Sequence, residues 1–519
     1  MSTRNTRCMV QNSAGGRAFA LDPFARLERF LILGADGPTY YAAQRTLALE
    51  NAACVTTCLA LDGARTVKTI ADVSNAGRAP KNDAALFALA MACGAPADAM
   101  RRAALNALPR VCRTGTHLFQ FAETVGRFRR WGRGLRRAVA AWYLDLGTDA
   151  LVRQVLKYGQ RQGWSHRDVL RLSHAAPRTP AQQAVFRWLT AKEITATDAG
   201  LEALSEACRA FEALRARSVT EAEVIASVRR HKFTHEMLPT EWKRSPAVWA
   251  ALLEDMPLTA MLRGLAQMTS VGLLTPGSEA AAFVGRKLTD AAALGRARIH
   301  PLAVLSALRV YRSGRGLAGK LTWTSERGLC DALERCFDLS FRAITPSGKR
   351  HLLALDVSGS MSCGEVGGSP GLTPAMASAA MAMATLRVER HCELMGFSHQ
   401  LVDLPIRREH TLTQVMKIVQ DVPMGATDCA LPMLEAARTG RAVDVFVVYT
   451  DNETWFGKVH PHLALRQYRE KTGIAAKLAV VGLTATQFTI ADPDDAGSLD
   501  FVGFDAAAPA VMADFARAR

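Results

Sequence analysis

The stretch His351-Leu-Leu-Ala-Leu-Asp-Val-Ser-Gly-Ser360 joins an apolar run to three side chains that carry oxygen. Its first five residues predict a buried strand. Asp356, Ser358 and Ser360 follow at alternate positions, which places their oxygen atoms on one side of the loop. Open α/β sheets bind ligands in the crevice at the carboxyl ends of their strands. The stretch therefore predicts an α/β domain with a ligand site just beyond this strand.

Two later segments supply further oxygen donors. Thr427 follows Gly425 in a loop, and the apolar run 443–450 predicts a second strand that ends immediately before Asp451. Five oxygen donors from three loops, with no Cys or His among them, suit Mg²⁺, Mn²⁺ or Ca²⁺ rather than zinc. The predicted metal ligands are Asp356, Ser358, Ser360, Thr427 and Asp451. The alternative is a Ser-rich turn with an unrelated Thr and Asp.

From about residue 346 onward, predicted strands and helices alternate. The expected strands cover residues 350–356, 391–397, 443–450, 476–482 and 499–503. Residues 375–384 predict a helix whose small side chains pack tightly on the sheet. This alternation is typical of a doubly wound, mostly parallel sheet. We therefore assign residues 346–519 to an α/β domain.

Residues 1–345 predict a second domain, a helical array without strands. Gly, Pro, Ser or Thr separates most of its amphipathic segments, and Ser165 with Asp168 predicts the start of one helix. Such a succession favours stacked helical pairs, which bury their core only between neighbours. The expected helices cover residues 84–95, 100–108, 117–125, 134–144, 150–161, 166–173, 181–192, 199–216, 220–231, 246–254, 258–268, 279–293 and 301–313.

Charge is distributed unevenly between these two domains. Residues 346–519 hold 16 Lys and Arg against 19 Asp and Glu, a net charge of −3. The chain holds 64 against 48, so residues 1–345 hold 48 against 29, a net charge of +19. Nucleic acid is the commonest polyanion bound by a protein this basic, although membranes and acidic proteins are alternatives. The helical domain is therefore the expected polyanion surface.

Length and cysteine usage indicate the class of protein. A chain of 519 residues is long enough for two or three domains with ample cores. The chain opens on polar and basic residues, and its apolar runs are too short to span a bilayer. Eleven scattered Cys fit reduced thiols. We expect a cytoplasmic protein with no membrane partner.

Basic residues around position 165 are candidates for phosphate contacts. Lys157 and Arg161 are four residues apart on the expected helix 150–161, and so would share a face. Arg167 and Arg171 would lie on the next helix, which ends near His174. The alternatives are a solvated charged face and, for His174, a helix end that faces the dipole.

A second basic cluster, at residues 127–137, mixes Arg with aromatic residues. Arg130 and Arg133 would bind phosphates there, while Phe128 and Trp131 would stack on bases as in single-strand binders. The alternative is that both aromatic side chains face the core. A third cluster at residues 229–232 is a weaker candidate.

Distinctive short motifs occur along nearly the whole chain. They are Asn12-Ser-Ala-Gly-Gly16, Gly77-Arg-Ala-Pro-Lys-Asn-Asp83, Gly163-Trp-Ser-His-Arg-Asp168, Arg171-Leu-Ser-His174, Thr427-Asp-Cys-Ala-Leu-Pro-Met433 and Tyr449-Thr-Asp-Asn-Glu-Thr-Trp455. These motifs resemble the Ro autoantigen family, in which a TROVE module precedes a von Willebrand factor A domain. The resemblance implies a monomeric ring of HEAT-like helical pairs closed by the A domain. It also implies a metal-ion-dependent adhesion site at the five predicted ligands, with one position open for a partner's carboxylate.

The same resemblance implies an RNA-binding function without catalysis. Small noncoding Y-type RNAs would bind the outer surface of the ring, and Lys157, Arg161 and His174 match the contact positions of the family. Single-stranded 3′ ends of misfolded RNAs would enter the central hole. The protein would serve as a ribonucleoprotein scaffold in RNA quality control, with a 3′-to-5′ exonuclease such as polynucleotide phosphorylase as a partner.

Two other functions fit the predicted cation site. A metal-dependent nuclease would use the ion between Asp356 and Asp451, although the set has mainly hydroxyls and no evident general base beside it. A protein-interaction module would use the ion to hold an acidic side chain of a partner. The second function is compatible with RNA binding, whereas the first would make the protein an enzyme.

Overall fold

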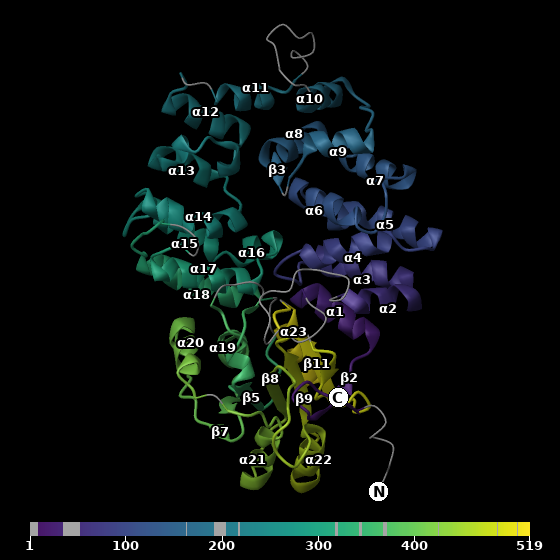
Figure 1. Ribbon diagram of the computed structural model, residues 1–519. Helices are drawn as coiled ribbons and strands as arrows, with labels where there is room; N and C mark the ends of the chain where they lie inside the picture. The colour runs from purple at the N-terminus through teal and green to yellow at the C-terminus, as the bar shows by residue number, and fades with distance from the viewer. Residues whose placement is uncertain are drawn as a thin grey trace.

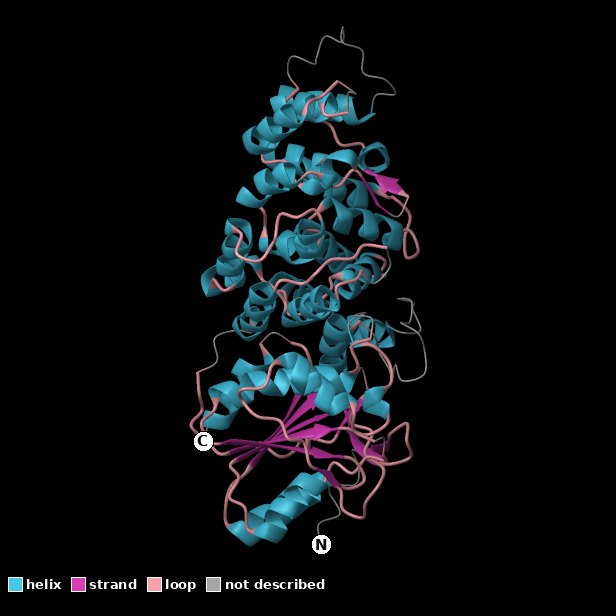
Figure 2. Ribbon diagram, turned by 90° about the vertical axis from the view of Figure 1, so that its left-hand side faces the viewer, coloured by secondary structure: helices cyan, strands magenta, loops and turns pink. Residues whose placement is uncertain are grey.

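The computed structural model describes residues 9–34, 52–161, 163–190, 204–215, 218–316, 320–341, 345–366, 371–423, 425–484, 486–505 and 507–518. Helices make up most of the first 340 residues, and a six-stranded sheet with its own helices follows (Figures 1 and 2). The predicted fold class, a helical array joined to an α/β domain, is therefore confirmed.

The helices of the first part form two arms that face each other and meet at the far end of the molecule (Figure 1). Neighbouring helices pack in sequence along each arm, as expected for stacked helical pairs. Their bounds are α1 Pro23–Leu33, α2 Ala53–Leu61, α3 Gly63–Ala76, α4 Asp83–Cys93, α5 Asp98–Val111, α6 Gly115–Val125, α7 Arg133–Leu144, α8 Thr148–Lys157, α9 His166–Ser173, α10 Pro180–Thr190, α11 Glu206–Ala213, α12 Glu221–His231, α13 Pro246–Glu254, α14 Leu258–Ser270, α15 Glu279–Leu288, α16 Ala291–Ala297, α17 Pro301–Ser313 and α18 Arg327–Ser340.

Local capping explains why several helix bounds were predictable. The Ser165 side chain accepts a hydrogen bond from the Asp168 amide, and the Asp168 carboxylate accepts one from the Ser165 amide, which completes a capping box for α9. Ser245 and His300 cap α13 and α17, and each helix has Pro at its first position. These three helices match the expected ranges.

Other helix predictions need correction. The expected helix 279–293 is two helices, because the chain breaks at Thr289 and Asp290 caps α16. The expected helix 199–216 lies partly outside the described residues, and its described part is α11. Helices α1, α2, α3 and α18 were not predicted. The array also contains a short hairpin of β3 (Gln160–Arg161) and β4 (Trp164–Ser165).

The C-terminal sheet has the strand order β11-β9-β8-β5-β6-β7, in which only β7 is antiparallel. Helices cover both faces, with α19, α20 and α23 toward the helical arms and α21 and α22 on the far side (Figure 1). The predicted doubly wound sheet is thus confirmed. The bounds are β5 His351–Asp356, α19 Pro374–Val388, β6 Cys392–Phe397, β7 Leu401–Val402, α20 Leu412–Gln420, α21 Leu431–Thr439, β8 Val445–Thr450, α22 Pro461–Thr472, β9 Lys477–Gly482, β10 Phe488–Thr489, β11 Ser498–Val502 and α23 Ala508–Arg517.

Strand β5 contributes to two separate cores. Leu353 and Leu355 belong to the large core that also includes α19, whereas Leu352 and Ala354 belong to the core beneath α21 and α22. Successive side chains of a strand point to opposite faces, so this division follows from the period of two. A strand buried on both faces is apolar throughout, which is why the run was recognisable.

The first two strands of the chain belong to the sheet part. Strand β1 (Met9–Gln11) pairs with β2 (Arg17–Ala20), and β2 pairs with β10. Helix α1 follows directly and is anchored by Arg29, whose guanidinium lies 2.6 Å from both oxygens of Asp500 in β11. The N-terminal residues, which the predicted boundary at 345/346 assigned to the helical domain, therefore connect the two parts.

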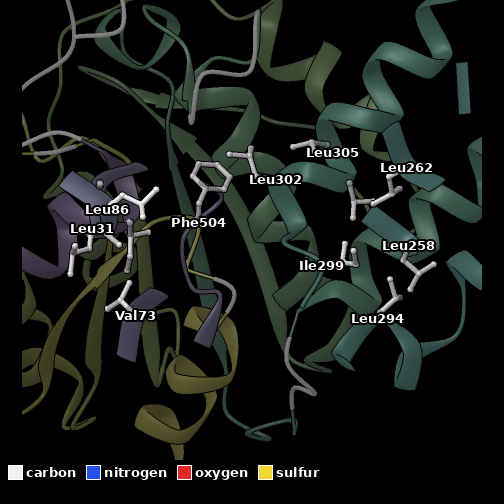
Figure 3. Packing of buried hydrophobic residues seen from close by; sticks show 14 of the residues in the cluster. Leu31, Val73, Leu86, Leu258, Leu262, Leu294, Ile299, Leu302, Leu305 and Phe504 are labelled. Carbon is white, nitrogen blue, oxygen red and sulfur yellow. The ribbon is translucent and has the colours of Figure 1, made fainter. Parts of the chain in front are cut away.

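Both ends of the helical array meet the sheet domain at one junction. The His300 Nε2 atom lies 2.7 Å from the Phe504 carbonyl oxygen and 3.1 Å from the Arg78 carbonyl oxygen. Arg78 in turn pairs with Asp505 at 2.7 Å. Figure 3 shows Phe504 beside Leu302 of α17, where the apolar contact continues. The junction closes the helical arms into a ring.

Acidification should destabilise this fold because several histidines are buried in the neutral form. Burial lowers the pKa of His166 and of His300 to about 4, against an ordinary value of 6.5. The unfolded chain therefore takes up more protons as the pH falls from 6.5 to 4, and stability is lost across that window, by on the order of 3 kcal/mol for each group. We expect the urea concentration at the midpoint of unfolding to decrease when the pH is lowered from 7 to 5. An unchanged midpoint would contradict this assignment.

None of the described helices is long and apolar enough to cross a membrane. The ten described cysteines are free thiols.

Candidate functional site

The two predicted carboxylate ligands lie at the same edge of the sheet. Asp356 is the last residue of β5, and Asp451 follows β8, its parallel neighbour. Parallel neighbours end at the same edge, so the two side chains are brought close together without any long-range coincidence. Both residues are completely buried.

Hydrogen bonds order the loop that follows Asp356 and contains Ser358 and Ser360, called the Ser loop below. The Ser358 amide donates to Asp356 Oδ1 at 3.0 Å, and the Ser358 and Ser360 hydroxyls are hydrogen-bonded at 3.2 Å. The Gly359 amide donates to the Gly425 carbonyl at 3.0 Å, which holds the Ser loop against the loop that carries Thr427. These contacts place the Ser hydroxyls beside the third donor loop.

The Thr427 loop is also tied to the loop that follows Asp451. The amides of Trp455 and Phe456 donate to the Thr427 carbonyl oxygen at 3.1 and 3.0 Å. The structure thus brings all five predicted oxygen donors together at one edge of the sheet. Their role as metal ligands stays a prediction.

The electrostatics of this edge favour a cation. Burial and, to a smaller extent, the nearby charge of Asp451 raise the pKa of Asp356 to about 7, in spite of the lowering effect of hydrogen bonds from Ser358 and Thr450. A divalent ion would offset the cost of two buried neighbouring carboxylates. In the described part of the chain, no cluster of three or more His, Cys, Asp and Glu is suited to a metal. Hydroxyl and carboxylate donors of this kind fit Mg²⁺, Mn²⁺ or Ca²⁺.

Asp451→Asn should abolish or strongly weaken divalent-ion binding, because it removes one of only two charges in the donor set. Calorimetric titration with Mg²⁺ or Mn²⁺ measures this, and Asp421→Asn, at an exposed position of the same domain, is the control. Binding should also weaken as the pH falls through about 7, because Asp356 must lose its proton to bind a cation. If Asp451→Asn and Asp421→Asn release the same heat on titration with the ion, Asp451 is not a metal ligand.

A turn near the N-terminus contacts the sheet edge that carries the five predicted metal ligands, called the cation edge below. This contact was not predicted. Asn12 is buried and its side-chain amide donates to the Thr454 carbonyl at 2.7 Å, while the Ala14 amide donates to Glu453 Oε2 at 3.1 Å. A Cβ atom on Gly16 would lie 1.9 Å from the Thr454 oxygen, so only glycine fits. The motif at residues 12–16 was noticed for its resemblance, but no local pattern reveals a partner more than 400 residues away.

The structure corrects the predicted helix face of Lys157 and Arg161. Helix α8 ends at Lys157, because Tyr158 leaves the helical conformation, and Arg161 lies in β3. Lys157 is only 18% exposed and its Nζ atom lies 3.8 Å from Glu236 Oε1. Arg161 is exposed, and its guanidinium donates a hydrogen bond to the carbonyl of the neighbouring Gln160. The two residues therefore do not form one charged helix face.

The next candidates lie on and beside α9 as expected. Arg167 is half-buried, Arg171 is exposed, and their spacing of four places both on one face. His174 is exposed and caps the helix in the left-handed conformation, with its amide bonded to the Leu170 carbonyl. Its position matches the alternative of a residue at the helix end.

The second basic cluster is split between core and surface. Phe128 packs edge-on against Phe87, in agreement with the core alternative. Trp131 instead stacks on Trp164 of β4, with ring centroids 6.5 Å apart. Arg130 and Arg133 are exposed, and among the described residues neither forms an ion pair. The Trp contact joins this cluster to the hairpin that carries Arg161.

The third basic cluster is neutralised by acidic partners. Arg229 pairs with Glu254, Arg230 with Glu206, and Lys232 with Asp255, at 2.6 to 2.8 Å. These pairs reduce the charge available for phosphate. We therefore keep this cluster as a control rather than as a candidate contact surface.

A cavity of about 990 Å³ lies between the two arms. One side is lined from the α3–α6 region and the other from α14 to α17, which face each other in Figure 1. Among the described residues that line it, four are Lys or Arg, and Asp83 is the one that is acidic. The basic residues are Lys81, Arg113, Arg263 and Arg298. None of these four was predicted as a contact, because the opposing arms are far apart in sequence.

Known protein families match both parts of the chain. The TROVE domain model matches residues 10–232 and 227–310, and the Ro60 vWA domain model matches residues 350–516. A protein of Deinococcus radiodurans named RNA-binding protein RO60 is 44% identical over 511 residues, covering 98% of this chain and 95% of the relative. A protein of the same name from Caenorhabditis elegans is 35% identical, covering 98% and 90%.

A solved structure agrees with these matches. The crystal structure of the Deinococcus radiodurans RO (RSR) protein superposes with a TM-score of 0.71 and covers 96% of this chain and 99% of that chain. The two sequences are 44% identical. The resemblance indicated by the sequence motifs is thereby confirmed. The chain belongs to the Ro60 family, in which a TROVE domain is joined to a Ro60-type vWA domain.

Proposed function

We propose that the protein is an RNA-binding ring and the scaffold of a ribonucleoprotein. Small structured RNA of the Y type would bind the outer surface of the helical part. The observation that carries this proposal is the group of exposed guanidiniums at Arg130, Arg133 and Arg161, which form no ion pairs with described residues. Unneutralised cations on a domain of net charge +19 favour phosphate binding. The names of the two relatives support the same function.

The central cavity is proposed to hold the unpaired 3′ end of a structured or misfolded RNA. Its basic lining supplies phosphate contacts, and the half-buried Tyr158, which also lines it, supplies an aromatic ring. A cavity of about 990 Å³ is within the usual range for a ligand site, and a short single strand is its proposed occupant.

Cleavage of the bound RNA is assigned to a partner rather than to this chain. The donor set of the cation edge consists mainly of hydroxyls, and its one strongly shifted carboxyl, Asp356, is buried. We therefore propose a cytoplasmic scaffold that presents RNA to a 3′-to-5′ exonuclease such as polynucleotide phosphorylase. Incubation of labelled RNA with the pure protein and Mn²⁺ should leave the RNA intact. Metal-dependent cleavage that Asp451→Asn removes would favour the nuclease alternative.

The proposal is tested by fluorescence anisotropy with two hairpin RNAs, one blunt and one with a single-stranded 3′ tail. We expect both to bind through the outer surface, and the tailed RNA to bind more tightly. Arg263→Gln with Arg298→Gln should remove the advantage of the tail and leave the blunt hairpin unaffected. Equal affinity for a neutral polymer and for both RNAs would overturn the proposal.

A second, compatible function is the binding of a protein partner at the cation edge. Trp455 and Phe456 are 51% and 46% exposed, although their amides are fixed on the Thr427 carbonyl. Exposed aromatic side chains beside a cation suit an acidic side chain with an apolar neighbour. Binding of an acidic, aromatic-containing peptide in Mg²⁺ that is lost in a chelator would support this function. Binding unaffected by the chelator would exclude the ion from it.

A further inference from the structure

We propose that Trp131 and Trp164 form a stacking site for an unpaired RNA base on the surface of the helical arm. The inference rests on the proposed RNA-binding function and names a specific contact within it. The two indole rings are half-buried, their planes are 23° from parallel, and their centroids are 6.5 Å apart. A base can extend such a stack because every base has a flat π face.

The orientation of Trp164 is fixed from two directions. The Trp164 indole nitrogen donates to Glu123 Oε2 at 2.7 Å, and the β3–β4 hairpin holds the backbone of Trp164. Both rings also pack against the edge of the hydrophobic core. A ring held in this way loses little further freedom when a base stacks on it, which favours binding.

Cations surround the pair on both elements that supply it. Arg161 lies directly opposite Trp164 in the antiparallel register, so the two side chains share a face of the hairpin. Arg130 precedes Trp131 in sequence, and Arg133 begins α7 two residues later. The site therefore offers phosphate contacts on either side of a stacking surface. Figure 2 shows the hairpin at the edge of the helical array.

Two tryptophans of the array, Trp142 and Trp249, differ from this pair. Trp142 and Trp249 are 6% and 2% exposed, and their indole nitrogens donate to the carbonyls of Cys112 and Lys243. They are structural residues of the core. Trp131 combines partial exposure with basic neighbours, a combination typical of single-strand binding surfaces.

The ligand class is an unpaired nucleotide in RNA, such as one beside a base-paired stem. Bases within a duplex are already stacked and cannot reach an indole, whereas unpaired bases can leave the helix. Stacking tolerates any base, so the site would recognise unpaired nucleotides without preference for their sequence.

The test uses the protein with Arg263→Gln and Arg298→Gln, so that the central cavity does not hold the single strand. It compares a 12-nucleotide single-stranded RNA with a blunt 12-base-pair RNA duplex. Trp131→Leu and Trp164→Leu should each weaken binding of the single strand by about 5-fold to 100-fold. Duplex binding should change by less than about 2-fold, since it depends on phosphate contacts. Trp131→Phe should retain most of the affinity, and Trp188→Leu, at a half-buried tryptophan of the same array whose indole nitrogen donates to Glu212, is the matched control.

Two outcomes separate this inference from the proposed function. Failure of the unaltered protein to bind either RNA would overturn the proposed function itself. Normal binding of the single strand by both Leu variants would overturn only the stacking site. If either Leu variant unfolds, ultraviolet crosslinking of the unaltered protein decides the question. Crosslinked peptides that contain Trp131 or Trp164 support the site, and crosslinks confined to other peptides reject it.

Discussion

Replacement of Arg130, Arg133 and Arg161 together by Gln should lower the affinity for RNA by a factor on the order of 10² to 10³ at 0.1 M salt. Each guanidinium is exposed and forms no ion pair with described residues, so each is available to displace a counterion from RNA. The slope of log affinity against log salt should fall by about 2 to 3, since each phosphate contact contributes about 0.7 to 0.9. Anisotropy titrations over a range of salt concentrations measure both quantities.

The matched control is the triple variant of Arg229, Arg230 and Lys232 to Gln. These side chains have similar exposure, but each is paired with an acidic residue of the helical part. Their removal should therefore change the salt slope much less. An equal loss for the two triple variants would show that net charge, rather than this surface, determines RNA affinity. Lys157, paired with Glu236, is also expected to have a smaller effect than Arg161.

Arg29→Met should destabilise the protein by about 3 to 5 kcal/mol, the usual cost of breaking a buried ion pair. Arg29 is 2% exposed, and its guanidinium contacts both oxygens of Asp500 at 2.6 Å and the Thr486 hydroxyl at 2.8 Å. The substitution leaves Asp500 without its charged partner and loosens α1 from the sheet. Urea unfolding, followed by the circular dichroism of the aromatic side chains, measures the loss.

Two further variants make this prediction specific. Addition of Asp500→Leu to Arg29→Met should recover much of the stability, because the unpaired charge is then removed. Lys68→Met, which breaks an exposed pair with Asp72, should cost less than about 1 kcal/mol. An Arg29→Met loss as small as that of Lys68→Met would mean that the buried pair is not required to hold α1 on the sheet.

The parts of the fold that follow local rules were predictable from the sequence. A capping box marks α9, and a cap followed by Pro marks α13 and α17. Strands β5 and β8 are buried on both faces and so are continuous apolar runs. Their adjacency in a parallel sheet also explains why the cation edge could be assembled from sequence spacing.

The parts that depend on distant partners were not predictable. Strand β2 is four residues long and pairs with β10, more than 450 residues later. Helix α2 is apolar on most of its surface and so lacks the expected periodicity. The expected helix through Arg161 failed because the chain turns at Gly163, in the left-handed conformation, to form the β3–β4 hairpin.

The residues predicted to bind RNA likewise depend partly on local sequence and partly on distant contacts. Sequence identified the basic clusters, but it did not show which charges are neutralised. Lys157 and Arg230 meet acidic partners on other elements, whereas Arg130 and Arg133 meet none among the described residues. The stacking of Trp131 on Trp164, which joins two separate clusters, also depends on tertiary packing.

Ultraviolet crosslinking in the native cells, followed by sequencing of the attached RNA, shows whether the protein is an RNA-binding scaffold. We expect enrichment of one or a few small structured RNAs, together with RNAs that end in unpaired 3′ tails. The triple variant of Arg130, Arg133 and Arg161 should lose the structured RNAs. RNA recovery equal to that of a neutral control protein would contradict the account, and the net charge of +19 would then serve another polyanion.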